Sequence, residues 1–161
     1  MKKYIKEFIK YIIIITILLN IVSYYKSLEL NKQKLFLTNL TLVDGLEYKI
    51  KDNKPLIIYF WATWCPICKI ESPNIDSLSK NYEVLTIAVN SGDNESIKEY
   101  IKQKGYNFKV YNDFDSSIAN SFNIKAYPTI LIYDKNKNLA FSDVGYTSTL
   151  GLYLRLIWAS F

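Results

Sequence analysis

The feature that most constrains the fold is a continuous apolar run, LIIYFWA, over residues 56–62, followed closely by the chain's two cysteines, Cys65 and Cys68. An apolar run without alternation is typical of a strand that is buried on both faces of a sheet. Pro66 favours the first turn of a helix, where its missing N–H is not needed. The sequence therefore predicts a central strand, a short loop and a helix that begins between the two thiols.

Strands and helices alternate along the rest of the chain. The pattern predicts strands over residues 35–42, 83–90, 108–113, 129–134 and 138–144, a short strand with a loop over 47–54, and helices over 66–81, 95–104, 116–122 and 148–159. Such alternation, closed by a hairpin and a last helix, is typical of an α/β domain with a mixed sheet. We expect one domain, residues 35–161.

The first segment, residues 1–26, joins a lysine-rich start to an apolar run within residues 8–25. A spanning helix needs about 20 apolar residues, and Lys10 and Lys26 are long enough to reach the two interfaces. We expect an uncleaved transmembrane helix that contacts the bilayer through residues 8–25. A cleaved signal peptide and a buried soluble helix are the alternatives, and no small-residue cleavage site follows the run.

The lysines before the apolar run predict which side of the membrane each part occupies, because basic flanks stay in the cytoplasm. We expect a single-pass protein of a bacterial inner membrane, with a cytoplasmic N-terminus, a spacer over residues 27–34 and a periplasmic domain. Outside the cytoplasm thiols tend to be oxidised. The two cysteines are thus expected to form a disulfide or a redox couple.

Composition excludes several classes of function. The chain has no histidine, which removes Ser-His and Cys-His catalysis and His-ligated zinc. Its formal charge of +5 arises in the first segment, where Lys2, Lys3, Lys6, Lys10 and Lys26 face only Glu7. Because later charges nearly balance, we expect no basic face and no nucleic-acid partner.

The spacing of the cysteines favours redox chemistry over the other roles of paired thiols. Cys65 is predicted at a helix N-terminus, where free N–H groups and the helix dipole lower a thiol pKa from about 8.5. Cys68 follows one turn later and can resolve a mixed disulfide on Cys65. A structural bridge this short removes little chain entropy, and zinc needs four ligands, but Cu(I) accepts two thiolates. No cofactor is expected.

The stretch FWATWCPIC, residues 60–68, resembles the active site of the thioredoxin superfamily. Pro73 matches the family's helix-kinking proline, and Tyr127-Pro128-Thr129 matches the loop whose proline is cis and faces the disulfide. The resemblance implies a thioredoxin-like fold, a central mixed β-sheet flanked by helices, and a protein-disulfide oxidoreductase. It also implies supporting roles for Trp64, Pro66 and the Tyr127-Pro128 pair, whose exposed backbone would meet the partner.

Glu71, the segment over residues 84–105 and the membrane anchor narrow the resemblance to the TlpA/ResA/CcmG-like branch. Within it, the chain is similar to membrane-bound ScsD-type protein disulfide oxidoreductases in the stretches PLIIYFWATWCPIC over residues 55–68, AVNSGD over 88–93 and VGYTSTLGLYLRLIWA over 144–159. Thioredoxin's buried aspartate is replaced by Tyr59, so Glu71 becomes the candidate proton acceptor. The alternative for Glu71 is an ordinary exposed helix carboxylate. We interpret Arg155 in the last helix as a solvated charge, with a role in partner binding as the alternative.

The predicted function is a membrane-anchored extracytoplasmic thiol-disulfide oxidoreductase that reduces exported proteins through Cys65 and Cys68. Apocytochrome c and copper-stress clients are candidate partners, and a membrane thiol would supply electrons. A disulfide oxidase or isomerase of the same fold and a Cu(I)-binding protein are the alternatives. A peroxidase is disfavoured because Ala62 stands where the T-x-x-C arrangement carries threonine.

Overall fold

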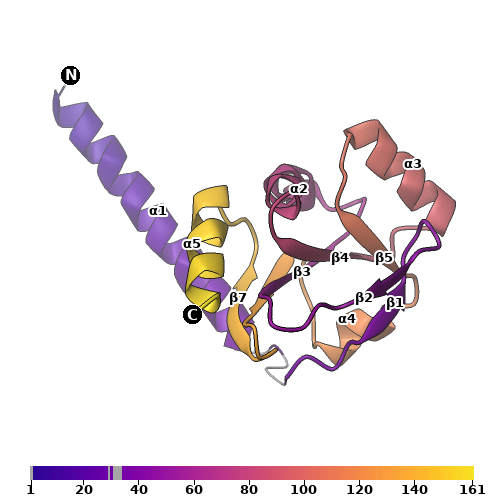
Figure 1. Cartoon of the computed structure of the whole chain (residues 1–161). Helices are drawn as coiled ribbons and strands as arrows, with labels where there is room; N and C mark the ends of the chain where they lie inside the picture. Colours follow the sequence, from indigo (N-terminus) through magenta and orange to yellow (C-terminus); the bar gives the residue numbers. More distant parts are fainter. Residues whose placement is uncertain (1, 29, 31–33) are drawn as a thin grey trace.

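The structure is a computed structural model that describes residues 2–28, 30 and 34–161. Its main sheet has the strand order β5-β4-β3-β6-β7, and β1 and β2 form a separate antiparallel pair (Figure 1). The strands are β1 (Asn39–Thr41), β2 (Glu47–Lys49), β3 (Leu56–Trp61), β4 (Glu83–Val89), β5 (Lys109–Asp113), β6 (Thr129–Tyr133) and β7 (Leu139–Val144). The helices are α1 (Lys2–Leu28), α2 (Pro66–Ser79), α3 (Asn94–Lys104), α4 (Ser117–Ser121) and α5 (Thr149–Ala159).

Strand β3 lies at the centre of the sheet, as the apolar run predicts. Every residue of β3 is buried, because the strand has neighbours on both edges and elements on both faces. It runs parallel to β4 and antiparallel to β6, and Phe60 pairs with Ile87 on one side and Thr129 on the other. The mixed α/β sheet is therefore confirmed.

Alternate residues of β3 point into two different cores. Ile57, Tyr59 and Trp61 pack with residues of α2, α3 and α5 on one face of the sheet. Leu56, Ile58 and Phe60 pack with residues of α4 and of the β1–β2 pair on the other. Figure 1 shows α2 and α3 on one side of the sheet and α4 with β1 and β2 on the other. This layering presents the end of β3 to the start of α2.

The strand predicted over residues 35–42 was too long, because only Asn39–Thr41 forms a strand. Within residues 47–54 the short strand Glu47–Lys49 is followed by a loop, as predicted. Leu35 and Leu37 are partly buried against the second core without belonging to a ladder. Apolar composition thus reflected packing of a loop on the sheet rather than strand pairing.

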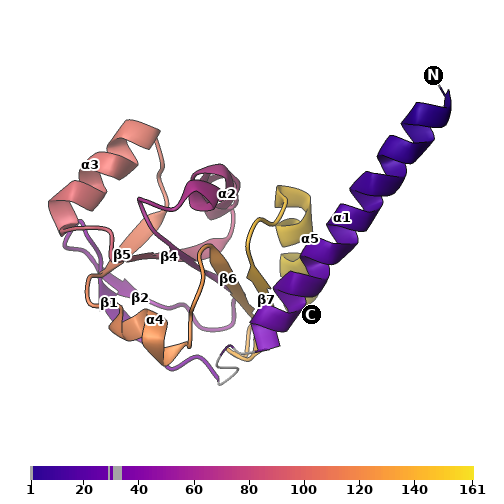
Figure 2. The same cartoon turned by 180° about the vertical axis from the view of Figure 1, so that it is seen from behind.

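Helix α1 contacts β7 and extends away from the domain (Figure 2). It ends at Leu28, two residues beyond the predicted segment boundary. The predicted spacer, residues 27–34, falls partly outside the described residues, which omit 29 and 31–33, and Leu30 is buried in the second core. Within the part of the chain that the structure describes, no helix has the length and apolarity that crossing a membrane requires.

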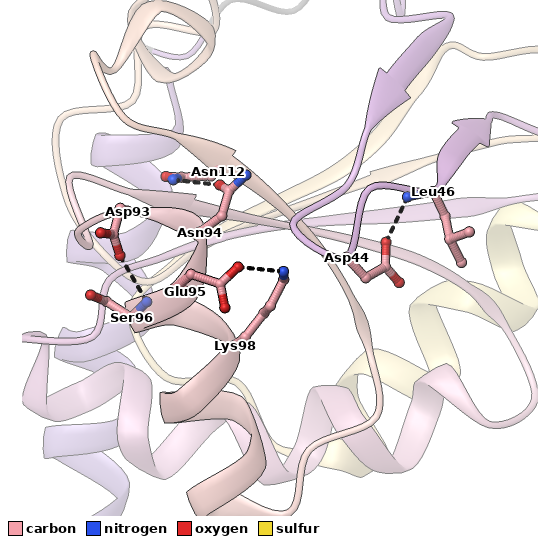
Figure 3. Close-up of polar contacts among 8 residues, drawn as sticks. All are labelled: Asp44, Leu46, Asp93, Asn94, Glu95, Ser96, Lys98 and Asn112. Carbon is pink, nitrogen blue, oxygen red and sulfur yellow. Dashed lines mark hydrogen bonds and ion pairs between the residues drawn. The ribbon is translucent and has the colours of Figure 1, made fainter.

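Polar contacts fix the loop between β4 and α3 (Figure 3). The Asp93 carboxylate caps α3 by accepting a hydrogen bond from the Ser96 N–H at 2.8 Å. The Asn112 side chain donates to Asn94 at 2.9 Å and so ties the start of α3 to β5. The same loop contains Asn90 and Ser91, which contact the segment before α2.

Candidate active site: the disulfide at the start of α2

Cys65 and Cys68 form a disulfide at the N-terminus of α2, with sulfurs 2.31 Å apart. Cys65 is the N-cap residue, in extended conformation, and its Sγ accepts a hydrogen bond from the Cys68 N–H at 3.1 Å. Pro66 occupies the first turn, as predicted. The amide of Cys68 therefore points at the Cys65 sulfur, where it would stabilise a thiolate in the reduced protein.

The two sulfurs lie just beneath the surface. Cys65 is 4% exposed and Cys68 only 1%. Pro66 and Ile67, which separate them, are exposed. The arrangement thus offers Cys65 first to an approaching disulfide and keeps Cys68 behind it.

An aromatic pair stands beside the disulfide. Trp64 is 59% exposed, and its indole N–H donates to the Asn90 carbonyl at 3.0 Å. Its ring meets Tyr127 edge to face, with 5.8 Å between the centroids. The hydrogen bond anchors one edge of the indole, so the ring presents an oriented apolar surface to solvent.

The Tyr127–Pro128 peptide bond is cis, the state that the resemblance implies. Pro128 is buried, Tyr127 is half-buried, and the Pro128 carbonyl accepts a hydrogen bond from the Gly145 N–H at 2.8 Å. The loop before β6 and the end of β7 are thereby held together. Trp64 and the Tyr127-Pro128 loop come from distant parts of the chain, and the fold brings them to the same end of the sheet.

Glu71 is fully buried, so the alternative of an exposed helix carboxylate is wrong. Its Oε2 accepts a hydrogen bond from the Thr147 N–H at 3.0 Å, and its Oε1 has no hydrogen-bond partner among the described residues. Burial raises the pKa of Glu71 to about 7, against the opposing effects of Thr147 and Asn74 and with a further rise from Asp143. A carboxyl with this pKa can take up and release a proton near neutrality.

Tyr59 contributes a polar group that the sequence reasoning missed. Its hydroxyl lies 3.3 Å from the Cys68 carbonyl and 3.2 Å from Ser72 Oγ. Burial raises the pKa of Tyr59, so its hydroxyl stays protonated. Tyr59 therefore does not replace an aspartate as a base, but it holds the second turn of α2 against β3. Its place six residues before Cys65 was the available signal.

Arg155 is not a solvated charge, which corrects the sequence interpretation. Its Nη2 donates to Asp143 Oδ1 at 3.1 Å, and its Nε lies 3.1 Å from Asp143 Oδ2. The two side chains are 29% and 15% exposed. The last helix and β7 are thus joined by an ion pair on the same side of the sheet as Glu71.

The fold and the cysteine pair define a thioredoxin-like protein of the thiol-disulfide oxidoreductase class. The AhpC/TSA family model matches residues 33–142, and the chain belongs to this family. A thioredoxin-like protein of Haemophilus influenzae is 37% identical over 113 residues, which cover 70% of this chain and 67% of that protein.

Other relatives and structures agree with this assignment. The thiol-disulfide oxidoreductase ResA of Geobacillus kaustophilus is 31% identical over 103 residues, 60% of this chain and 59% of that protein. The chain thus matches less than two thirds of the length of this relative. The thioredoxin lipoprotein Etrx1 of Streptococcus pneumoniae superposes with a TM-score of 0.67 at 26% identity, over 74% of this chain and 97% of that one. StoA of Bacillus subtilis, at 18% identity and a TM-score of 0.65 over 73% of this chain and 93% of that one, shares the fold.

Proposed function

We propose that the protein reduces disulfide bonds of exported proteins through Cys65 and Cys68. The observation that carries the proposal is the disulfide at the N-terminus of α2, with the Cys65 sulfur facing the Cys68 N–H at 3.1 Å. Ala62 occupies the position of the threonine in a T-x-x-C peroxidase site. Disulfide exchange is therefore proposed in place of peroxide reduction.

The reaction begins from the dithiol form. The Cys65 thiolate attacks one sulfur of the partner's disulfide, forms a mixed disulfide, and the partner's other sulfur leaves as a thiolate. Cys68 then loses its proton and attacks the Cys65 sulfur, which expels the partner's remaining sulfur. Two electrons have passed to the partner, which is now a dithiol, and the Cys65–Cys68 disulfide has formed.

Glu71 is proposed to accept the proton that Cys68 loses. Both residues are buried on the same helix and are separated by one turn. A buried thiol has no water at hand to take its proton, and Glu71 Oε1 has no hydrogen-bond partner among the described residues. A carboxyl with a pKa of about 7 is matched to this task near neutral pH.

Trp64, Tyr127 and Pro128 are proposed to contact the partner. Trp64 offers an exposed, oriented ring, and Tyr127 packs edge-on against it. An extended segment of a partially unfolded protein would meet this apolar surface beside the Cys65 sulfur. Such recognition tolerates many sequences, as a reductase of several exported proteins requires; apocytochrome c and copper-stress proteins are candidate partners.

A location at the outer face of a bacterial inner membrane is proposed as well. Support comes from α1, whose exposed residues include Phe8, Ile13, Ile17, Leu18 and Val22. Alkaline extraction of membranes checks this proposal: the full chain should stay with the lipid, whereas a chain with Ile13, Ile17 and Leu18 all replaced by lysine should be released. A periplasmic cysteine label should reach Cys65 in intact cells only after reduction.

The direction of electron flow is tested by the reduction potential of the Cys65–Cys68 couple. A reductase supplied by a membrane thiol should have a potential well below about −150 mV, whereas a higher value would make the protein an oxidase. Stoichiometric Cu(I) binding by the dithiol form without any disulfide exchange would favour the metal-binding alternative. Glutathione-buffered equilibria with thiol alkylation measure the potential.

Trapping identifies the partner. Cys68→Ser should leave Cys65 joined to the partner in a stable mixed disulfide that a reductant releases. The matched control is the variant with both cysteines replaced by serine, which should capture nothing. If Cys68→Ser captures no exported protein while its Cys65 still reacts with a small disulfide, the proposed substrate class is wrong.

A further inference from the structure

We propose that Asp143 and Arg155 form a positioning pair for Glu71, and that through Glu71 they set the pH range over which Cys68 attacks the mixed disulfide. The inference rests on the proposed role of Glu71 in disulfide exchange. It assigns a purpose to two charged residues that lie away from the sulfurs. Neither residue touches the reacting atoms, so both act through the carboxyl of Glu71.

The sheet register places Asp143 on the face that α2 and α5 cover, because its pairing partner Ile130 packs with residues of these helices. Glu71 projects from α2, Asp143 from β7 and Arg155 from α5, and Asp143 acts electrostatically on Glu71. Arg155 faces Asp143 with both Nη2 and Nε, each 3.1 Å from a carboxylate oxygen. Two acidic side chains therefore lie on the same face of the sheet, and the cation binds the second of them.

Residues between β7 and the start of α5 are hydrogen-bonded to α2. The Thr147 N–H donates to Glu71 Oε2 at 3.0 Å, and Thr149 Oγ1 donates to the Asn74 side chain at 2.8 Å. Thr147, whose amide binds Glu71, follows Asp143 by only four positions. A shift of β7 or α5 would be transmitted to the carboxyl of Glu71.

The other groups that face Glu71 do not supply a charge near neutral pH. Tyr59 from β3 interacts with Glu71, and its hydroxyl stays protonated because burial raises its pKa. Asn74 on the same helix is neutral, and Thr147 presents its backbone amide. Cys68, one turn earlier, is the proposed proton donor. Asp143 is therefore the charge that most directly affects Glu71, and Arg155 determines how strongly it does so.

The arrangement predicts opposite effects for the two partners. Burial raises the pKa of Asp143, and Arg155 opposes that rise. Replacing Arg155 with methionine removes the positive charge, which makes ionisation of both carboxyls harder and moves the attack of Cys68 to higher pH. Replacing Asp143 with asparagine leaves the positive charge of Arg155 and removes the repulsion, which moves the attack to lower pH. A nearby like or opposite charge shifts the titration of a carboxyl by about one unit.

The test isolates the second step of exchange in the full chain. Cys65 of the reduced protein is first converted to a mixed disulfide with a chromogenic aryl thiol, and the release of that thiol by Cys68 is followed by stopped-flow absorbance across the neutral range. The variants are Arg155→Met, Asp143→Asn, Arg155→Lys and Glu71→Gln. Lys51→Met is the matched control, because it breaks the 2.8 Å ion pair with Glu83 away from the site.

The midpoint of the release rate should rise by about one pH unit in Arg155→Met and fall by about one unit in Asp143→Asn. Arg155→Lys keeps the positive charge, so its midpoint should stay close to that of the wild type. Lys51→Met should also leave the midpoint unchanged. A merely structural role would lower the rate at every pH in both variants without moving the midpoint in opposite directions. That result, or two shifts of the same sign, would overturn the inference.

Glu71→Gln separates this inference from the proposed function. If its release rate keeps the wild-type pH profile, Glu71 is not the proton acceptor and the proposed role fails. If Glu71→Gln changes the profile but neither Arg155→Met nor Asp143→Asn moves the midpoint, only the present inference fails. Should Arg155→Met not fold, Asp143→Asn still gives the sign of the effect, because a midpoint that does not fall would overturn the inference.

Discussion

The first and second turns of α2 handle the two sulfurs by different physical means. The first turn, with Pro66 and Ile67, is exposed, and a backbone N–H faces the Cys65 sulfur. The second turn contains Glu71 and Ser72, both buried, and side chains from other elements surround it. A thiolate at Cys65 thus depends on local helix geometry, whereas the proton of Cys68 depends on groups that only packing assembles.

The comparison teaches where variation in such a site can arise. Any helix that begins at a cysteine after a buried strand supplies the first environment. The environment of the second turn needs Tyr59 from β3, Asp143 from β7 and the Thr147 amide. This environment therefore changes whenever one of these elements shifts. The nucleophile should therefore be robust to distant substitutions and the resolving step sensitive to them.

The largest effect is expected from the substitution that removes the Cys65 sulfur. Cys65→Ser should lower reduction of a model disulfide protein by about 10³-fold or more, because serine supplies no nucleophile of comparable reactivity at neutral pH. The rate of substrate reduction in the presence of a thiol donor measures it. An equal loss of the initial attack in Cys68→Ser would break the distinction between the two sulfurs.

A second substitution addresses the second turn alone. Glu71→Gln preserves shape and one oxygen acceptor but removes the proton acceptor, so release of the partner by Cys68 should slow by about 10²-fold near neutral pH. Formation of the mixed disulfide at Cys65 should keep its rate. Quenched-flow alkylation resolves the two steps, and equal slowing of both would show that the two turns are not independent.

The buried carboxyl should also be visible in stability. Its pKa is raised from 4.5 to about 7 in the folded protein, so the folded state binds more protons between these values and wild-type stability falls as pH rises through them. Glu71→Gln lacks this loss. The free energy of unfolding of Glu71→Gln minus that of the wild type should therefore be about 1–3 kcal/mol larger above pH 7 than at acidic pH. Urea unfolding of the oxidised forms measures this, and a difference that is constant with pH would contradict it.

The smallest effect concerns the surface beside the first turn. Trp64→Ala should raise the KM for a protein disulfide by about tenfold and leave kcat nearly unchanged, because the exposed ring contributes binding rather than chemistry. Trp158→Ala is the matched control, since Trp158 is 74% exposed but lies on α5. Steady-state kinetics with both variants checks this prediction. If Trp64→Ala and Trp158→Ala have the same KM, Trp64 does not contact the partner.

Sequence reasoning succeeded where the signal was local. The central strand, the start of α2 at Pro66 and the positions of the two cysteines follow from an apolar run, a proline and a spacing. It failed where a residue's surroundings come from elsewhere in the chain. The strand over residues 35–42 was too long because apolar composition does not distinguish ladder pairing from packing.

The errors and gaps at the site have the same origin. Arg155 was interpreted as solvated because nothing beside it in the sequence pairs with it; Asp143, its partner, lies 12 residues earlier, across the turn from β7 to α5. For the same reason, the sequence did not decide whether Glu71 is buried or exposed. Burial and charge pairing are properties of the assembled layers.

By itself, the amino-acid sequence determined that this protein has an α/β sheet and two thiols at the N-terminus of a helix. Strand and helix propensities and helix caps act within a few residues, so a short stretch of sequence is enough to predict them. Only the tertiary structure decided that Glu71 is buried and that Asp143 and Arg155 form an ion pair. The raised pKa of Glu71 depends on exclusion of solvent and on the charge of Asp143 from another element, which no short stretch of chain contains.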